Sequence, residues 1–279
     1  MTPEATFSEA ARALAPWSVS KAKLVKTCGL AWKYKYVDHL TEHPGAKTRV
    51  GLGAHAVLER MERGAPAAAA LEEAHRTLEL TTEERAGLEP LLEGILRFIE
   101  TLAHFRARST IDRELCEERL GLDENLEPTG FSARDVFFRG AWDLGFVLAD
   151  GRVAIVDHKA SRTKDLKWHA EQLRAYAIMA LAHFPALRKV WPAIHFVASG
   201  EIVWGRPTNA DEIRNSLRAW FVTWINEAAA RASNPDPQPV VSRFCEHCGY
   251  RPQCPAHTME AAGERLVALS TRRALTGSP

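Results

Sequence analysis

The stretch RGAWDLGFVLADGRVAIVDHK, residues 139–159, decides the fold. Apolar, β-branched and aromatic residues on both sides of a turn at residues 149–151 predict a β-hairpin. Gly151 would supply the left-handed conformation that commonly ends a three-residue loop. In that register Asp143 lies directly opposite Asp157, with their β-carbons about 5 Å apart.

Two facing carboxylates in an apolar setting repel each other unless a cation lies between them. Their oxygens are suitable ligands for Mg²⁺ or Mn²⁺. Lys159, two residues beyond Asp157, would share its face and stabilise negative charge on a phosphate. A two-residue turn would instead place the acids on opposite faces, as a strand end and a solvated edge residue.

Three residues outside the hairpin are candidate additions to this site. His55 lies in an apolar helical turn, where it is either a structural histidine or a third metal ligand. Gln172 and Tyr176 are four residues apart and would share one face of the following helix. Either this face looks back over the hairpin, or Tyr176 is a core residue with its hydroxyl pointing outward.

The rest of the chain alternates helical and strand patterns. Apolar spacing predicts helices on both sides of a small mixed sheet and no internal repeat. The expected helices cover residues 48–62, 67–79, 83–106, 168–184 and 211–231. The expected strands cover residues 114–120, 136–148, 153–156, 190–197 and 201–205, and a turn is expected at residues 128–130.

Composition and charge exclude several classes of protein. The 279 residues are 46% hydrophobic and 25% charged, which is typical of a globular domain and not of a disordered chain. No apolar run reaches the ~18 residues needed to cross a bilayer, and the N-terminus does not resemble a signal peptide. We therefore expect a cytoplasmic protein without a membrane partner, and association with the nucleoid or a phage origin fits equally.

The net charge of +1 conceals a basic segment at residues 17–36, which holds five lysines and no acid. Lysines interleaved with aromatic residues suit a phosphate backbone and stacked bases. The alternative is a helical segment whose aromatics pack inward while its lysines are merely solvated. The candidate nucleic-acid contacts are Lys21, Lys23, Lys26, Trp32, Lys33 and Tyr34.

The cysteines indicate a metal centre. Cys245 and Cys248 form a CxxC pair, and Cys254 follows six residues later. Cys28 is the better fourth ligand, because Cys116 is flanked by acids that would oppose a thiolate. Zinc usually takes paired knuckles, whereas one CxxC with two further cysteines suits an iron–sulfur cluster better. Zinc remains the alternative occupant.

In chain order, these features resemble the PD-(D/E)XK nuclease superfamily, and most closely its RecB-like branch with an iron–sulfur cluster. That branch includes stand-alone CRISPR-associated exonucleases. The resemblance is carried by residues 17–20, Cys28, residues 53–55, 140–143, 155–159 and 172–176, and the cysteines at 245, 248 and 254. It implies an α/β restriction-endonuclease-like core with a central mixed sheet, a helical N-terminal elaboration and a cluster-bearing C-terminal cap.

The resemblance also implies a role for each matched residue. It makes His55, Asp143 and Asp157 ligands of Mg²⁺ or Mn²⁺, with His158 lending its carbonyl. It makes Lys159 the catalytic lysine, and it puts Gln172 and Tyr176 in the helix motif of the branch. It makes Cys28, Cys245, Cys248 and Cys254 the ligands of a 4Fe-4S cluster. One departure is Asp157, which stands where many relatives have Glu and leaves the metal preference open.

The expected organisation is one nuclease domain over residues 1–263. It divides into a helical part (1–110), a catalytic core (111–231) and a cysteine segment (240–258) joined by Cys28, and a flexible tail follows at 264–279. The resemblance implies hydrolysis of DNA, preferably single-stranded and from an end, in recombination or repair. Since no Walker A pattern occurs, any helicase, recombination or CRISPR-adaptation partner would be a separate chain. The alternatives are an inactive DNA-binding or assembly subunit and a zinc-stabilised DNA-interaction module.

Overall fold

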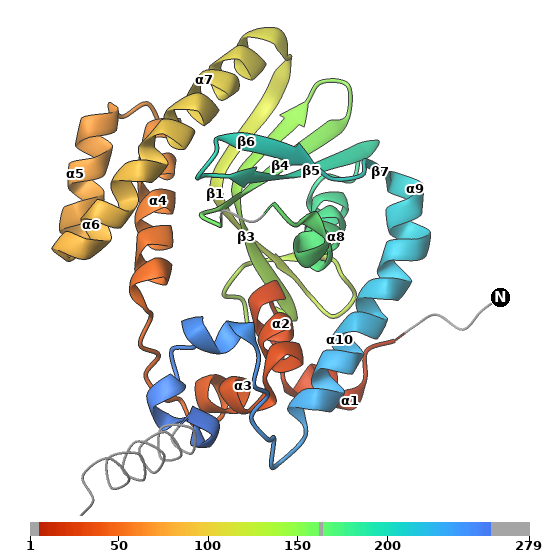
Figure 1. Ribbon diagram of the computed structural model, residues 1–279. Coiled ribbons are helices and arrows are strands. Elements are labelled where there is room, and N and C mark those ends of the chain that lie inside the picture. The colour runs from red at the N-terminus through yellow and green to blue at the C-terminus, as the bar shows by residue number, and fades with distance from the viewer. Residues whose placement is uncertain (1–5, 162–163, 258–279) are drawn as a thin grey trace, which may run out of the picture.

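The computed structural model describes residues 6–161 and 164–257. The expected tail at 264–279 and the last residue of the expected cysteine segment, residue 258, lie outside these ranges. A mixed sheet occupies the centre, in the strand order β2-β1-β3-β4-β5-β6 with β7 pairing with β5 (Figure 1). Its strands are β1 (Ile111–Leu122), β2 (Pro128–Thr129), β3 (Phe138–Leu148), β4 (Arg152–Lys159), β5 (Lys189–Phe196), β6 (Glu201–Trp204) and β7 (Thr208–Asn209). Among these strands of the described residues, only β4 and β5 pair in parallel.

The predicted hairpin is confirmed in its register. Leu144 pairs with Val156, so Asp143 and Asp157 each lie one residue beyond this pair. The loop consists of residues 149–151, and Gly151 has a φ of 80°. A side chain is rarely found in this left-handed region, which explains why glycine ends the loop.

Helices cover both faces of the sheet. They are α1 (Glu9–Ala13), α2 (Val19–Thr27), α3 (Gly29–Tyr36), α4 (Ala46–Glu62), α5 (Ala67–Thr77), α6 (Thr82–Leu88), α7 (Leu92–Arg108), α8 (Leu166–His183), α9 (Ala210–Glu212) and α10 (Arg218–Ala232). Short 3₁₀ turns are η1 (Glu89–Leu91), η3 (Arg243–His247) and η4 (Arg251–Gln253), and η2 (Ile213–Leu217) is a π-helical turn. None of the described helices is long and apolar enough to span a bilayer.

The structure corrects the prediction of one helix over residues 83–106. The chain forms α6 and α7 with η1 between them, and Pro90 lies in η1. Proline lacks an N–H and crowds the preceding turn, so it interrupts a continuous helix. The predicted helix over 211–231 likewise includes the η2 turn, and the predicted turn at 128–130 contains the short strand β2.

Successive residues of a strand point to opposite faces of the sheet and therefore pack against different helices. In β4, Val153 and Ile155 pack into one cluster together with residues of α8 and α10. Ala154 and Val156 pack into the other cluster, which holds residues of α4 and α7. A strand buried on both faces explains the continuous apolar run in this part of the sequence.

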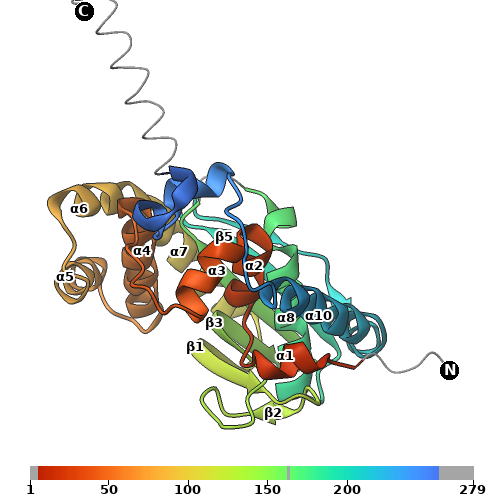
Figure 2. The ribbon, with the colours of Figure 1, turned by 90° about the horizontal axis from the view of Figure 1, so that it is seen from below.

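The C-terminal cysteine segment folds against the N-terminal helices. It lies beside α3, as both views show (Figures 1 and 2). The backbone N–H of His43 donates to the carbonyl of Gly249, and the Tyr34 hydroxyl donates to the carbonyl of Gln253. The cysteine segment is therefore in direct contact with α3 and the residues that follow it.

Candidate functional site

Three side chains from three elements meet at the edge of the hairpin. His55 of α4 places its Nδ1 3.7 Å from Oδ2 of Asp143 on β3. Glu117 of β1 completes the group, and one ligand atom from each residue lies within 4.8 Å of the others. Two carboxylates and an imidazole form a donor set that suits a hard divalent cation. The structure therefore joins His55 and Asp143 as the sequence predicts, and it adds Glu117.

The alternation of side chains between the two faces of the sheet is interrupted in β3 and β1 near Asp143 and Glu117. On β3, Trp142 packs into the cluster with α8, whereas Leu144, two residues later, packs into the cluster with α4. Glu117 on the neighbouring strand has a φ of 53°. A non-glycine residue in this region costs about 1–3 kcal/mol and is found mostly at functional sites. Because the alternation of faces is interrupted at these positions, the carboxylates of Glu117 and Asp143 can lie beside His55 of α4.

The acids of this group are crowded and poorly solvated. Burial, followed by the charge of Asp157, raises the pKa of Asp143 to about 6. Burial, followed by the charge of Asp143, raises the pKa of Glu117 to about 7. Burial also lowers the pKa of His55 to about 4, which keeps the imidazole neutral and able to act as a ligand. A bound cation would relieve the repulsion between the carboxylates.

Asp157 lies outside the 4.8 Å group and is held by a second set of residues. Its Oδ2 is 2.5 Å from Nζ of Lys159. Gln172 donates to Oδ1 of Asp157 at 2.5 Å and to the hydroxyl of Tyr176 at 2.9 Å, and Tyr176 in turn donates to the carbonyl of Ala141 at 2.8 Å. The face of α8 that carries Gln172 and Tyr176 therefore packs toward the hairpin, as predicted. These contacts fix the carboxylate of Asp157 beside that of Asp143.

Gly140 makes room for this part of α8. A β-carbon at Gly140 would lie 3.1 Å from Sδ of Met179 and 3.6 Å from a ring carbon of Tyr176. Contacts near 3.1 Å are tighter than most side chains tolerate, so a β-carbon here would require the flexible end of the Met179 side chain to shift. The glycine lets α8 pack closely at this point, where the Tyr176 hydroxyl lies 3.2 Å from Oδ1 of Asp157.

The side chain of His158 lies next to this site, with its ring centre 5.8 Å from that of His55, and forms a buried ion pair. Its Nε2 is 2.8 Å from Oε1 of Glu62, and both side chains are 2% exposed. Its Nδ1 is 2.9 Å from Nδ1 of His195, and its backbone N–H donates to Asp143 Oδ2 at 2.6 Å. Burial opposes a charge on His158, but the hydrogen bond to Glu62 and the charges of Glu62, Asp143 and Asp157 together outweigh it, and the net pKa is raised. The sequence analysis missed Glu62, which lies seven residues after His55 on α4 and hence on the same face.

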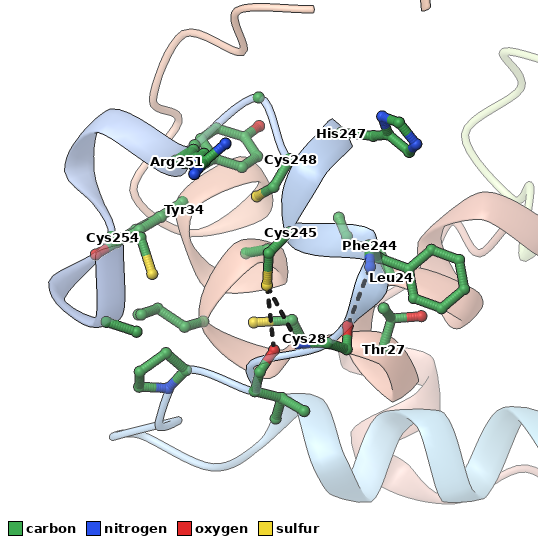
Figure 3. Close-up of a pocket in the computed structure, with 18 of the residues that line it drawn as sticks. Leu24, Thr27, Cys28, Tyr34, Phe244, Cys245, His247, Cys248, Arg251 and Cys254 are labelled. Carbon is green, nitrogen blue, oxygen red and sulfur yellow. Dashed lines mark hydrogen bonds between the residues drawn. The ribbon is translucent and has the colours of Figure 1, made fainter. Parts of the chain in front are cut away.

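The four predicted cysteine ligands surround one pocket of about 510 Å³. Cys28 lies where α2 gives way to α3, and its side chain faces the same space as Cys245, Cys248 and Cys254 (Figure 3). Burial raises the pKa of the Cys248 thiol, and the other three cysteines add to this shift. Cys116 lies elsewhere, with its sulfur 3.5 Å from Glu62.

The basic segment is only partly available to a ligand. Lys21 is buried and donates to the carbonyls of Leu14 and Pro16, and Trp32 is 3% exposed. The prediction that these two contact nucleic acid is therefore wrong, because core packing encloses both side chains.

The remaining candidates differ in their partners. Lys26 pairs with Glu171, Lys33 pairs with Asp38, and Tyr34 bonds to the cysteine segment. Lys23 forms no ion pair with any described residue; its ammonium donates to the carbonyl of Trp168 at 2.6 Å. The alternative of inward aromatics thus describes much of this segment, and Lys23 remains a candidate contact.

Comparison with known proteins identifies a family and a similar fold. No curated protein matches the chain. A solved structure of a "Putative exonuclease" from Eubacterium rectale is similar over 88% of this chain and 92% of its own, with a TM-score of 0.52 and 15% identity. The crystal structure of SSO0001 aligns over 86% and 98% at 14% identity, with a TM-score of only 0.35. The family model of the PD-(D/E)XK nuclease superfamily matches residues 16–255. The matched region contains the hairpin, α8 and all the candidate ligands, and the chain belongs to the PD-(D/E)XK nuclease superfamily.

Proposed function

We propose that this member of the superfamily is a divalent-metal-dependent DNA nuclease, an exonuclease that prefers single strands. The observation that carries the proposal is the meeting of Asp143, His55 and Glu117 beside the Asp157–Lys159 pair. Desolvated carboxylates with raised pKa values are typical of a site completed by a cation. The structural neighbour's name supports the choice of an exonuclease.

Each side chain has a defined task in this proposal. His55, Glu117, Asp143 and Asp157 would hold Mg²⁺ or Mn²⁺. Such an ion supplies an activated water and neutralises charge on the scissile phosphate. Lys159 keeps an ammonium at the mouth of the site, where it offsets negative charge that builds up on phosphate oxygens. His158 would lend its backbone carbonyl to the ion, and this group is separate from the backbone N–H that orients Asp143.

Gln172 and Tyr176 act through Asp157 and are positioning residues in this proposal. Gln172 uses both amide protons, one for Asp157 and one for Tyr176. Asp157 therefore keeps one orientation relative to Lys159. The shorter side chain of Asp, compared with Glu, makes this support from α8 more important for placing the carboxylate.

The decisive experiment is cleavage of end-labelled single- and double-stranded DNA with Mg²⁺ or Mn²⁺. Wild-type protein should shorten single strands from an end, and Asp143→Ala, Asp157→Ala and Lys159→Ala should abolish cleavage. Lys189→Ala is the matched control, because this exposed lysine begins β5 at the opposite end of the β4–β5 pair. Cleavage that survives all three changes would refute the assignment. Metal binding without cleavage by wild type would favour an inactive DNA-binding subunit.

We also propose that Cys28, Cys245, Cys248 and Cys254 hold a structural 4Fe-4S cluster. The four side chains line one pocket, to which the junction of α2 and α3 contributes Cys28 and the C-terminal segment contributes the other three. One CxxC pair with two further cysteines suits an iron–sulfur cluster better than zinc, which usually takes paired knuckles.

Spectroscopy tests the cluster separately from activity. Anaerobically purified protein should absorb broadly near ~400 nm and contain iron. Cys28→Ser should lose this absorbance, whereas Cys116→Ser should retain it, since Cys116 lies beside Glu62 and outside the pocket. Stoichiometric zinc in place of iron would contradict the proposal. A separate helicase, recombination or CRISPR-adaptation partner would supply any unwinding.

A further inference from the structure

A stacked pair of aromatic rings, of which Trp168 is exposed and Phe244 is half-buried, lies between the cysteine pocket and the catalytic residues. Trp168, in the first turn of α8, stacks on Phe244 of η3 with ring centres 4.6 Å apart and planes 19° apart. Trp168 is 39% exposed although it is a large apolar side chain. Flat, accessible aromatic surfaces on nuclease-like proteins are suitable for stacking with bases.

Two cations accompany the ring pair. Nζ of Lys23 lies 5.1 Å from the centre of the Trp168 ring, and Cζ of Arg243 lies 5.1 Å from that of Phe244 and 5.9 Å from that of Trp168. Within residues 6–161 and 164–257, neither cation forms an ion pair with a carboxylate, unlike Lys26 and Lys33. Their charge is therefore available to phosphates.

The ring pair is one helical turn from the catalytic network. Trp168, Gln172 and Tyr176 are spaced four residues apart and share one face of α8, with about 6 Å of rise between successive members. Gln172 contacts Asp157 directly. The ammonium of Lys23 donates to the carbonyl of Trp168 at 2.6 Å, which places this lysine at the first turn of α8. Burial lowers the pKa of Lys23, and the charge of Glu171 opposes that shift.

We propose that Trp168 and Phe244, with Lys23 and Arg243, form a stacking subsite that holds a base of a single strand next to the scissile phosphate. The inference deepens the proposed nuclease function and rests on it for the nature of the ligand. Duplex DNA cannot use this subsite without unpairing, because its bases are already stacked and paired. The subsite therefore explains a preference for single strands through named residues.

Binding without cleavage tests the subsite. The full chain in Ca²⁺ is titrated against a fluorescein-labelled single strand and against a strand of equal length that lacks bases. Trp168→Ala should weaken binding of the normal strand at least about fivefold and leave the abasic strand unchanged. Trp204→Ala is the matched control, since Trp204 is 45% exposed on β6 and should affect neither strand. Trp168→Phe should retain most of the affinity.

The charges are tested by the salt dependence of binding. Arg243→Gln should reduce the slope of log affinity against log salt by about one phosphate contact. If Trp168→Ala is poorly folded, Trp168→Phe and Arg243→Gln still decide the question. Equal binding of normal and abasic strands by wild type, or an unaltered affinity in Trp168→Ala, would overturn the subsite. Cleavage in Mn²⁺ is measured separately, so failure of the subsite and failure of the nuclease proposal are distinguishable.

Discussion

Replacing Asp143 by Asn should stabilise the metal-free protein while it removes the response to metal. Burial, with the charge of Asp157, raises the pKa of Asp143 from 3.8 to about 6. A shift of roughly two units at 1.36 kcal/mol each means that the ionised carboxylate costs the folded state about 3 kcal/mol. An uncharged amide avoids this cost, and its oxygen can still accept the backbone N–H of His158.

The sign of the pH dependence follows from the direction of the shift. Above pH ~6 the acid is ionised in both folded and unfolded states, so the full cost is present at pH 8. Below pH ~4 it is protonated in both states, so the advantage of Asp143→Asn should disappear as the pH falls through this window. Asp112→Asn is the control, because Asp112 is exposed on β1 and should change stability by less than about 0.5 kcal/mol.

Urea unfolding in EDTA at pH 8 and at pH 4 measures both effects. Added Mn²⁺ should then stabilise wild type by mass action and leave Asp143→Asn nearly unchanged. The reasoning fails if the variant is less stable than wild type in EDTA at pH 8, or if its advantage is the same at both pH values. A variant that responds to Mn²⁺ as wild type does would show that Asp143 is not a ligand.

Two further predictions concern the scaffold, and urea unfolding measures both. Gly151→Ala should lower the free energy of unfolding by about 1–2 kcal/mol, because φ at this position is 80°. Gly130→Ala is the control and should cost little, since its β-carbon would make an ordinary contact at 3.5 Å. Equal effects of the two changes would show that a side chain does not strain the loop. Glu62→Ala should lower the free energy of unfolding by about 3–5 kcal/mol, because it leaves the buried charge of His158 without a partner. Glu93→Ala removes one partner of an exposed ion pair and should cost less than about 1 kcal/mol. A small effect of Glu62→Ala would refute a charged buried pair.

The hairpin could be predicted because its information is local. Apolar alternation, a turn signal and one glycine fix the register, and the register in turn places Asp143 and Asp157 side by side. The central mixed sheet and the helical N-terminal region follow from similar patterns, and both are confirmed. The break between α6 and α7 was also visible as Pro90, but continuous helix-forming composition outweighed it in the prediction.

Glu117 could not be predicted because its role depends on a backbone conformation. On a regular strand its side chain would lie on the face of Leu115, which packs toward α8. The positive φ and the change of face at Asp143 together direct it toward His55. An acidic run at residues 112–127 contains seven acids, and nothing in the sequence singles out the one that lies at this irregular position.

The prediction for the basic segment was partly wrong because charge and aromatic content do not show which residues a side chain contacts in the folded protein. Lys21 and Trp32 have the composition of a binding surface, yet tertiary packing buries both. Lys23 and Lys26 both face α8, but Lys26 meets the carboxylate of Glu171 there, whereas Lys23 meets a carbonyl and an aromatic ring.

Trp168 was overlooked for the opposite reason. At four-residue spacing from Gln172 and Tyr176, an aromatic at the start of an apolar helix is normally a core residue. The contact that keeps it at the surface comes from Phe244, seventy-six positions away and beside the CxxC pair. One rigid helix therefore presents a ring to the cysteine segment at its first turn and an amide to Asp157 at the next. We therefore expect a change that displaces η3 to disturb the Trp168 ring more than the carboxylate of Asp157, because Phe244 of η3 contacts Trp168 directly and Gln172 contacts Asp157 one turn later.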